Sequence, residues 1–463
     1  MDLTEKDIPP VPQENKMGVM PVNKLLLTMS IPIMISMLVQ ALYNIVDSIF
    51  VAQISENALT AVSLAFPMQN LLIAVGVGTG VGVNALLSKS LGEKNFFMAN
   101  KAANNSIFLG IVSWLVFVVI GIFFTKAFYL FQTDVADIVE QGTIYLQICC
   151  IFSFGIFGQI FTERLLQATG KTGLSMVIQL VGAFINLILD PILIFGWFGL
   201  PAMGVAGAAI ATVLGQILSM ILGFYLNIKY NKEIELKVKE IKPYMPAIKR
   251  IYSVGVPSII MSSVGSVMTF GMNKILIAFS TTATAVFGVY FKVQSFIFMP
   301  VFGLNNGLVP IMAYNYGAKR GDRMMETLKY GIIYATALML LGIAVFQLFP
   351  GLLLSMFNAS TQMIDIGIPC LRIISISFLF AGFCIVCGSV FQALGNGFLS
   401  LWVSIGRQLV VLLPAAFLLA QLGNVDYVWW SFPIAEIASL TLSSIFLKKI
   451  IKEKITPLMP DKP

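Results

Sequence analysis

Long apolar segments dominate this chain and decide what it can fold into. A helix needs about 20 apolar residues to cross a bilayer, because each residue adds only about 1.5 Å. Twelve such segments can be recognised in the 463 residues. Only 11% of the residues are charged, and the mean hydropathy is +0.89, whereas soluble domains carry about 25% charged residues. We therefore predict an all-α polytopic membrane protein with twelve transmembrane helices. The expected segments are 25–52, 59–87, 103–125, 143–165, 174–196, 204–228, 251–278, 283–312, 330–350, 366–391, 399–421 and 427–447.

Basic residues are concentrated in alternate loops. Lys and Arg cluster after the second, fourth, sixth, eighth and last segments, whereas the other loops are mainly acidic. By the positive-inside rule, this asymmetry predicts that both termini and the central loop are cytoplasmic. It also explains the net charge of +7 without a nucleic-acid partner. Residues 1–23 are polar and contain four prolines, and we expect a disordered cytoplasmic tail there.

The two halves of the chain repeat each other at an offset of about 225 residues. Each half has six segments, an even number, so the halves are expected to be parallel repeats related by an axis along the membrane normal. We therefore predict an N-lobe at 24–228, a basic linker at 229–250, a C-lobe at 251–448 and a tail at 449–463. The matching stretches are Ser30-Ile31-Pro32 with Gly255-Val256-Pro257, Gly92-Glu93-Lys94 with Gly317-Ala318-Lys319, and Gln167-Ala168-Thr169-Gly170 with Gln392-Ala393-Leu394-Gly395.

The residue types present exclude several kinds of chemistry. The chain has no His, so it has no His-based metal site, catalytic triad or imidazole relay. Its five cysteines fall in apolar segments, and we interpret them as small packing residues. The four alternating glycines from Gly76 to Gly82 predict close helix packing or a hinge. We expect no enzymatic activity and no cofactor other than a transported ion.

Three polar residues share one face of the first segment. Gln40, Asn44 and Asp47 are spaced by four and three residues, which aligns them on a helix. A carboxylate facing lipid is costly, so such residues usually face a cavity or a partner. In the fifth segment, Asp190 is expected at a similar depth, with Asn186 one turn below it. Pro191 predicts a departure from helical geometry at Asp190.

These groups predict an ion site within the N-lobe. Burial favours the neutral form of a carboxyl group, which makes it a usable proton carrier. While ionised, the same group attracts a cationic substrate or Na⁺. Protonation and substrate binding then compete for one negative charge, which is sufficient for antiport. Oxygen ligands for Na⁺ are available from Asp47, Asn44, Asn186, Asp190 and Thr212.

The second half does not repeat the carboxylates. At the same offset, Asp47 corresponds to Met272 and Asp190 to Ala415. Lys292 and Glu436 are both expected near mid-depth, and we hypothesise that they pair in a second-lobe cavity. The other charged residues of the apolar segments are Lys274, Arg372 and Arg407 in this half and Glu163 and Arg164 in the first; all but Arg407 are expected to snorkel to a membrane surface.

Two motifs resemble those of the multidrug and toxic compound extrusion (MATE) family, and most closely its bacterial MepA-like branch. They are Gln-Ala-Leu-Tyr-Asn-Ile-Val-Asp, ending at Asp47, and Asn-Leu-Ile-Leu-Asp-Pro, from Asn186 to Pro191. Gln-Ala-x-Gly also follows the fourth and tenth segments. The resemblance covers about residues 24–448, nearly the whole chain.

The resemblance implies a secondary active multidrug efflux transporter. Such a protein would export small cationic amphipathic drugs by cation-coupled antiport and alternating access across the bacterial cytoplasmic membrane. It implies ion-linked roles for Asp47, Asn186 and Asp190, and a weaker one for Thr212. Some Na⁺-coupled members carry an acidic residue in the seventh helix, but residues 253–280 contain none. H⁺ is therefore the preferred coupling ion, with Na⁺ at Asp47 and Asp190 as the alternative, and a monomer in the bilayer is expected.

Two alternatives come from other classes. A related flippase for lipid-linked oligosaccharide would need several basic residues in its cavity to bind pyrophosphate. An integral membrane enzyme would need a nucleophile, a metal site or a cofactor motif, and the sequence offers none.

Overall fold

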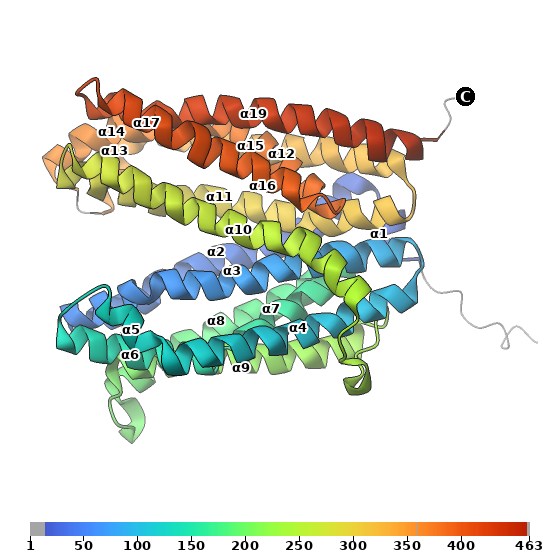
Figure 1. Ribbon diagram of the computed structural model, residues 1–463, viewed down its shortest axis with the longest axis horizontal. Helices are drawn as coiled ribbons and strands as arrows, with labels where there is room; N and C mark the ends of the chain where they lie inside the picture. Colours follow the sequence, from blue (N-terminus) through green and yellow to red (C-terminus); the bar gives the residue numbers. More distant parts are fainter. Residues whose placement is uncertain (1–13, 358, 461–463) are drawn as a thin grey trace, which may run out of the picture.

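The computed structural model describes residues 14–357 and 359–460, and within these ranges the regular structure is entirely helical. Helices α2 to α9 form the N-lobe and helices α10 to α19 form the C-lobe, so the predicted all-α, two-lobe fold is confirmed (Figure 1). The elements up to the end of the N-lobe are α1 (Lys16–Val19), α2 (Val22–Ala52), α3 (Glu56–Gly92), α4 (Phe96–Phe123), α5 (Thr125–Leu130), α6 (Ala136–Ile151), α7 (Phe154–Ala168), α8 (Thr172–Phe195), η1 (Trp197–Gly199) and α9 (Gly204–Tyr230).

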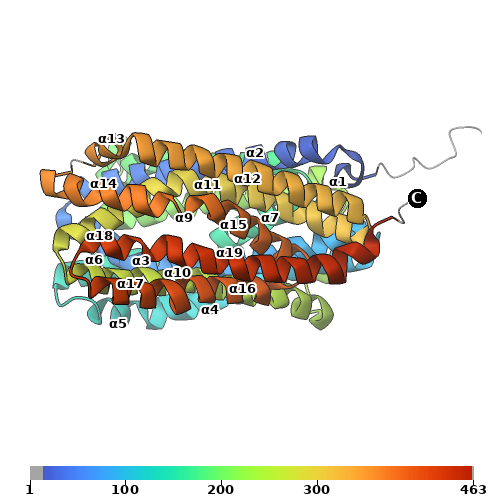
Figure 2. The ribbon, with the colours of Figure 1, turned by 90° about the horizontal axis from the view of Figure 1, so that it is seen from above.

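The linker and the C-lobe follow the same plan. Seen from above the C-lobe, α16 and α17 lie beside α10, whereas α12 and α14 lie beside α11 (Figure 2). The elements are η2 (Val238–Glu240), α10 (Met245–Ile277), α11 (Thr281–Gly317), α12 (Gly321–Leu348), α13 (Pro350–Ser355), α14 (Thr361–Ser375), α15 (Phe378–Ala393), α16 (Gly397–Ile405), η3 (Gly406–Leu412), α17 (Leu413–Ala420), α18 (Val425–Trp429), α19 (Ser431–Ile450), η4 (Ile451–Ile455) and η5 (Thr456–Leu458).

Most predicted transmembrane segments correspond to one helix, but two are bent. Among the described residues, nine helical stretches are long and apolar enough to span a membrane by themselves. The pairs α6–α7 and α14–α15 are bent by 45° and 50° and supply one span each. The twelfth segment is α19, which carries Glu436, Lys448 and Lys449 and runs along the whole C-lobe (Figure 1).

The sequence repeat is reproduced in backbone detail. Ser55 and Ser280 cap α3 and α11 with nearly the same extended geometry, and each hydroxyl accepts from the N–H three residues later. A Ser at this position satisfies a helix N–H that has no intrahelical partner. Lys94 and Lys319 both adopt positive φ, at 55° and 57°. Corresponding positions in the two halves therefore have the same local structure.

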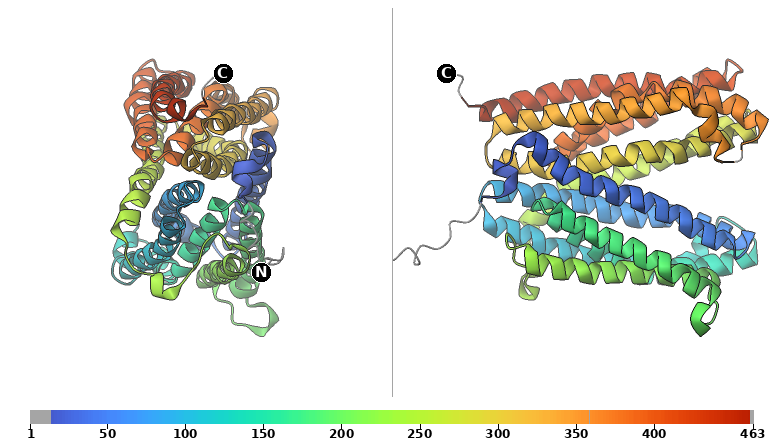
Figure 3. Two further views of the ribbon diagram at one scale, coloured as in Figure 1. Left: turned by 90° about the vertical axis from the view of Figure 1, so that its right-hand side faces the viewer. Right: turned by 180° about the vertical axis from the view of Figure 1, so that it is seen from behind.

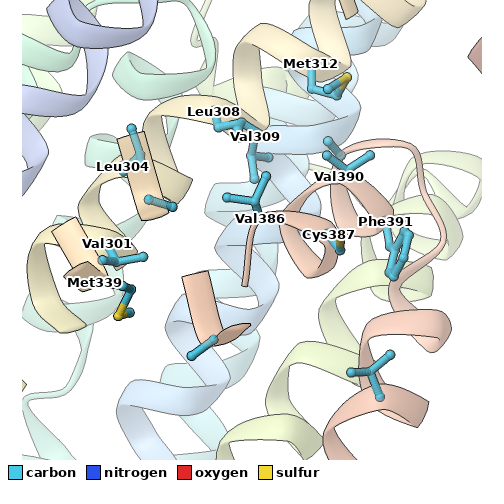
Figure 4. Packing of buried hydrophobic residues seen from close by; sticks show 14 of the residues in the cluster. Val301, Leu304, Leu308, Val309, Met312, Met339, Val386, Cys387, Val390 and Phe391 are labelled. Carbon is cyan, nitrogen blue, oxygen red and sulfur yellow. The ribbon is translucent and has the colours of Figure 1, made fainter. Parts of the chain in front are cut away.

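Apolar side chains fill each lobe. In the C-lobe, α11, α12 and α15 pack through residues such as Leu308, Met339 and Val390 (Figure 4). All five cysteines are free thiols; four are buried and Cys149 is half-buried, which confirms their role in packing.

The two lobes meet closely at the end of the molecule that holds α1, η5 and the Lys- and Arg-rich loops, here called the basic end (Figures 1 and 3). A Cβ on Gly82 of α3 would lie 2.1 Å from the Ile251 carbonyl oxygen of α10. A Cβ on Gly317 of α11 would lie 2.1 Å from the Lys89 carbonyl oxygen. Only glycine permits backbones to approach so closely, so the close packing predicted from Gly76 to Gly82 is confirmed.

Toward the opposite end, the lobes diverge. Helix α3 is almost completely buried from Gly76 to Gly92, whereas its first half includes Phe66, which is 66% exposed. The helices of the two lobes separate toward this end in Figure 1 and in the right panel of Figure 3. The lobes therefore form a V that is closed at the basic end.

The two chain ends are more ordered than the sequence indicates. Residues 1–13 lie outside the described range, but α1 is a helix whose Met17 is fully buried, so the expectation of a disordered tail through residue 23 is wrong for residues 16–23. After α19, the chain continues through η4 and η5, and the Lys454 ammonium donates to the Leu394 carbonyl at 2.7 Å. Backbone and side-chain contacts with the lobes explain both cases.

The linker is fastened to the N-lobe by asparagine side chains of α4. Asn100, Asn104 and Asn105 accept hydrogen bonds from backbone N–H groups of the linker at 2.7, 3.0 and 2.9 Å. Lys101 forms an ion pair with Glu240 beside them. This ion pair and a hydrogen bond from Lys101 hold the pKa of the Glu240 carboxyl below its usual value.

Candidate functional site

The N-lobe places two carboxyl groups near each other. Asp47 of α2 and Asp190 of α8 lie on helices that pack together, close enough for their charges to act on each other. Asp190 is fully buried and Asp47 is half-buried. Within the described residues, Asp47 Oδ1 is buried and has no hydrogen-bond partner. Repulsion between two ionised carboxylates in a low-dielectric interior favours states in which the pair holds a proton or a cation.

Asn186 and Thr212 complete this cluster. Asn186 lies one turn before Asp190 on α8, and Thr212 of α9 is hydrogen-bonded to Asn186. The Asn186 amide nitrogen donates to Asp190 Oδ2 at 3.1 Å when its oxygen accepts from the Thr212 hydroxyl and backbone N–H, both at 3.2 Å. This orientation satisfies every group involved. The structure thus assembles four of the six predicted N-lobe site residues, and their role in ion coupling stays a prediction.

The other two predicted residues lie beside the cluster. The Gln40 side-chain oxygen accepts from the Gln179 amide of α8 at 2.6 Å, which ties α2 to α8 below the carboxyl groups. Asn44 is exposed, at the edge of the same helix face.

Pro191 does not disturb the helix that carries Asp190. Helix α8 continues through Pro191 to Phe195, so the expected departure from helical geometry at Asp190 is wrong. A proline inside a helix removes one backbone hydrogen bond, which the packing of a membrane helix can compensate.

An apolar groove adjoins the carboxyl pair. It has a volume of 470 Å³ and lies between α2 and α8. Tyr43 lines this groove and also interacts with both Asp47 and Asp190. The remaining walls are Val39, Leu42, Val46, Leu180, Val181, Ala183, Phe184 and Leu187. The two carboxyl groups thus lie one side chain away from an apolar surface.

The C-lobe contains a different polar site. Glu436 of α19 is buried, and its Oε2 accepts from Arg407 Nη1 at 3.2 Å. Both residues line a small cavity of 60 Å³ together with Tyr290, Gln294 and Gln408. Arg407 projects from the π-helical turn η3. The hypothesised Lys292–Glu436 pair is wrong, because the partner of Glu436 is Arg407.

The other basic residues of the apolar segments do not enter this cavity. Lys274, Lys292 and Arg372 are all exposed. Whether each side chain enters the cavity depends on the rotation of its helix about the helix axis, and an estimate of depth does not give this rotation. The exposure of Lys274 and Arg372 agrees with the prediction that these side chains snorkel to a membrane surface.

Arg164 departs from the prediction. It was expected to extend to the membrane surface, but it is buried at the interface of the lobes. Its Nη1 donates to Gln167 Oε1 and to Asn306 Oδ1 of the C-lobe, both at 2.9 Å. Gly80 makes room for its side chain, because a Cβ there would lie 2.9 Å from Arg164 Cγ.

Sequence reasoning missed Tyr43 and Gln179. Tyr43 lies between Gln40 and Asp47, so the helix-face argument could have included it. Gln179 is a polar residue in an apolar segment and could have been noted in the same way as Gln40. Among the described residues, no group of three or more His, Cys, Asp or Glu side chains is placed to hold a metal ion.

Comparison with known proteins gives a consistent result. The MatE family model matches residues 32–192 and 257–418, once in each lobe. The multidrug export protein MepA of Staphylococcus haemolyticus (strain JCSC1435) is 26% identical over 434 residues, which cover 94% of each chain. MepA of Staphylococcus aureus (strain MRSA252) is 25% identical over 442 residues, covering 94% of this chain and 95% of MepA.

Solved structures share the fold. One, described as the outward-facing conformation of a multidrug resistance MATE family transporter of the MOP superfamily, has a TM-score of 0.89 and 23% identity. A MOP superfamily transporter from Pyrococcus furiosus Vc1 (DSM3638), described as having a binding pocket of reverse polarity, has a TM-score of 0.86 and 24% identity. Both superpositions cover 97% of this chain and 99% of the other.

Proposed function

The chain belongs to the MatE family of membrane transporters, and we propose that it is a secondary active multidrug efflux transporter that antiports cationic amphipathic compounds outward against H⁺. In this proposal the protein acts as a monomer in the bacterial cytoplasmic membrane, with both termini and the basic end in the cytoplasm. The basic loops support this orientation through the positive-inside rule.

The burial of Asp190 and of Asp47 Oδ1 on two helices that pack together is the observation that carries the proposal. In this site a bound proton and a bound organic cation satisfy the same negative charge. One proton or one monovalent cation is enough to relieve the repulsion between the two carboxylates, so binding of one weakens binding of the other. The apolar groove at Tyr43 supports an amphipathic substrate, since it offers apolar walls beside the charge.

The arrangement of Asn186 favours H⁺ over Na⁺. In the orientation that satisfies its hydrogen bonds, its amide nitrogen, a donor, faces Asp190, and its oxygen accepts from Thr212. A Na⁺ ion needs several oxygen ligands directed at one point, so Asn186 and Thr212 would have to reorient to supply them. A proton on the carboxyl pair needs no such change.

Alternating access is supported by the V of the two lobes. The glycine contacts close the basic end, and the lobes diverge at the opposite end. A transport cycle would open the basic end to load a drug and close it again to release the drug on the other side. Parallel repeats moving against each other around a central site are the usual design for this cycle.

The flippase alternative gains no support. Lys274, Lys292 and Arg372 are exposed rather than gathered in a cavity, and Arg407 is neutralised by Glu436. A diphosphate would meet no free cluster of basic side chains there.

The decisive experiment is transport of ethidium in proteoliposomes with separately imposed H⁺ and Na⁺ gradients. A pH gradient alone is expected to drive uptake against the dye gradient, and a Na⁺ gradient alone is not. Dye movement driven only by the Na⁺ gradient would identify Na⁺ rather than H⁺ as the coupling ion. No dye movement under either gradient would contradict the proposed function.

Asp47→Asn tests the carboxylate itself. The variant keeps the size of the side chain but cannot exchange a proton or hold a negative charge. Proton-driven ethidium export is expected to vanish while the protein still reaches the membrane at normal levels. Retained proton-driven export would remove Asp47 from the mechanism.

A further inference from the structure

A short N-terminal segment lies across the two lobes at the basic end. Residues 15–20, here called the N-terminal clamp, contain α1 and precede α2. A helix of four residues is not stable alone, so other contacts must hold the clamp in place. Met17 at its centre is fully buried.

The C-lobe binds the clamp through Arg323 and Asn315. Arg323 Nη2 donates to the carbonyls of Met17 at 3.0 Å and Met20 at 2.7 Å, and its Nε donates to Asn315 Oδ1 at 3.0 Å. The Asn315 amide donates to the same Met17 carbonyl at 3.1 Å. Arg323 is buried, with an exposed fraction of 8%, and these acceptors solvate its charge.

The N-lobe and its linker bind the other end of the clamp. The Asn15 amide donates to the Thr169 carbonyl at 3.0 Å and to Glu233 Oε1 at 2.7 Å. Lys171 forms an ion pair with the same Glu233. Thr169 follows α7, so this anchor belongs to the N-lobe, whereas Arg323 and Asn315 belong to the C-lobe.

The clamp therefore connects two bodies that are already in contact through glycines. Separation of the lobes at the basic end cannot preserve both sets of hydrogen bonds, because their protein partners move apart. A buried arginine that loses carbonyl acceptors must find water instead. This arrangement favours the closed form of the basic end.

We propose that residues 15–20 are an intramolecular clamp that keeps the basic end closed and is released when that end opens to the cytoplasm. This inference rests on the alternating access of the proposed function. It adds Arg323, Asn315 and Asn15 as positioning residues, which act on the balance between the two forms rather than on the bound drug or ion.

The test measures the distance between the lobes at the basic end. Spin labels are attached to Lys232→Cys in the linker and Lys452→Cys after α19, both exposed positions, in the full-length protein in liposomes. Pulsed electron paramagnetic resonance then reports the populations of short and long distances. Proton-driven ethidium export is measured on the same preparations.

Arg323→Gln is expected to raise the ratio of long to short distances by about tenfold, because two charge-assisted hydrogen bonds to the clamp are lost. Asn15→Ala, which loosens the other end without removing a charge, is expected to raise it by about threefold. The matched control is Arg320→Gln, since Arg320 is exposed, pairs only with Asp322 in the described structure and does not touch the clamp. It should leave the ratio unchanged.

Equal distance distributions in Arg323→Gln, Asn15→Ala and Arg320→Gln would overturn the clamp. If Arg323→Gln does not fold, the distance distributions of Asn15→Ala and Arg320→Gln are compared instead, and equal distributions would again overturn the clamp. The two proposals can fail separately. If the ratio of long to short distances shifts but no protein exports ethidium, the result supports the clamp and contradicts the transport function. If ethidium is exported but the ratio does not shift, the result supports the transport function and contradicts the clamp.

Discussion

The two lobes have one architecture and two kinds of buried charge. The N-lobe places two carboxyl groups near each other, and no ion pair is formed by either of them among the described residues. In the C-lobe the buried carboxylate Glu436 pairs with Arg407. The N-lobe pair has no counter-charge and therefore favours binding of a proton or a cation, whereas the charges of the C-lobe pair cancel.

This difference distinguishes the positions that shape the backbone from the positions that carry buried charge. Positions that shape the backbone, such as Ser55 and Ser280 or Lys94 and Lys319, keep the same geometry in both halves. The position of Asp47 differs, since its counterpart at the repeat offset, Met272, is a fully buried apolar residue. The fold tolerates either chemistry at that depth, so a single lobe can specialise.

The largest expected effect concerns the second carboxylate of the N-lobe. Asp190→Asn leaves Asp47 without the neighbour that makes the pair respond to protons. Proton-driven ethidium export should fall between about 10- and 100-fold, which corresponds to a coupling free energy of a few kcal/mol. The double variant Arg407→Gln/Glu436→Gln is the comparison and should keep its dependence on the pH gradient. If the double variant loses it instead, the coupling site lies in the C-lobe.

A smaller effect is expected on stability. Arg407→Gln leaves Glu436 buried without a counter-charge and should lower the free energy of unfolding by about 2–4 kcal/mol. Glu436→Gln should cost less, because the Arg407 side chain is 32% exposed and can be partly hydrated. The double variant should recover much of the loss, as judged from thermal unfolding in detergent. Additive losses would show that the two side chains act independently.

The smallest effect is expected for Lys292→Gln. Lys292 is exposed, and surface substitutions usually change stability by less than about 0.5 kcal/mol. Ethidium export and the unfolding temperature should both stay at the level of the unmodified protein. A clear loss of export would give Lys292 a role in the path of the substrate that its exposure does not indicate.

The N-lobe site was predictable because its residues are polar interruptions in apolar helices. Asp47 and Asp190 had to face the interior, and counting residues placed them at similar depth. The Arg407–Glu436 pair was not predictable in this way, since depth alone gives Glu436 several candidate partners and only the rotation of each helix decides among them.

The ends of the chain were harder to predict for a different reason. Residues 15–20 follow a polar stretch that contains three prolines and precede Pro21, a setting typical of a disordered tail. Their order comes from Arg323 and Asn315, which are some 300 residues away in the sequence. Such long-range contacts leave no local pattern. The helical fold, the repeat and the close glycine packing, by contrast, depend on local composition and were visible from the start.

The glycine contacts at the basic end have a thermodynamic consequence. The backbone contacts at Gly82 and Gly317 are flanked by buried apolar side chains of both lobes, such as Val83 of α3 and Leu304 of α11. Parting these surfaces uncovers apolar area, and the heat-capacity change of a process scales with the apolar area it exposes. The ratio of open to closed molecules should therefore follow a curve rather than a straight line as the temperature changes.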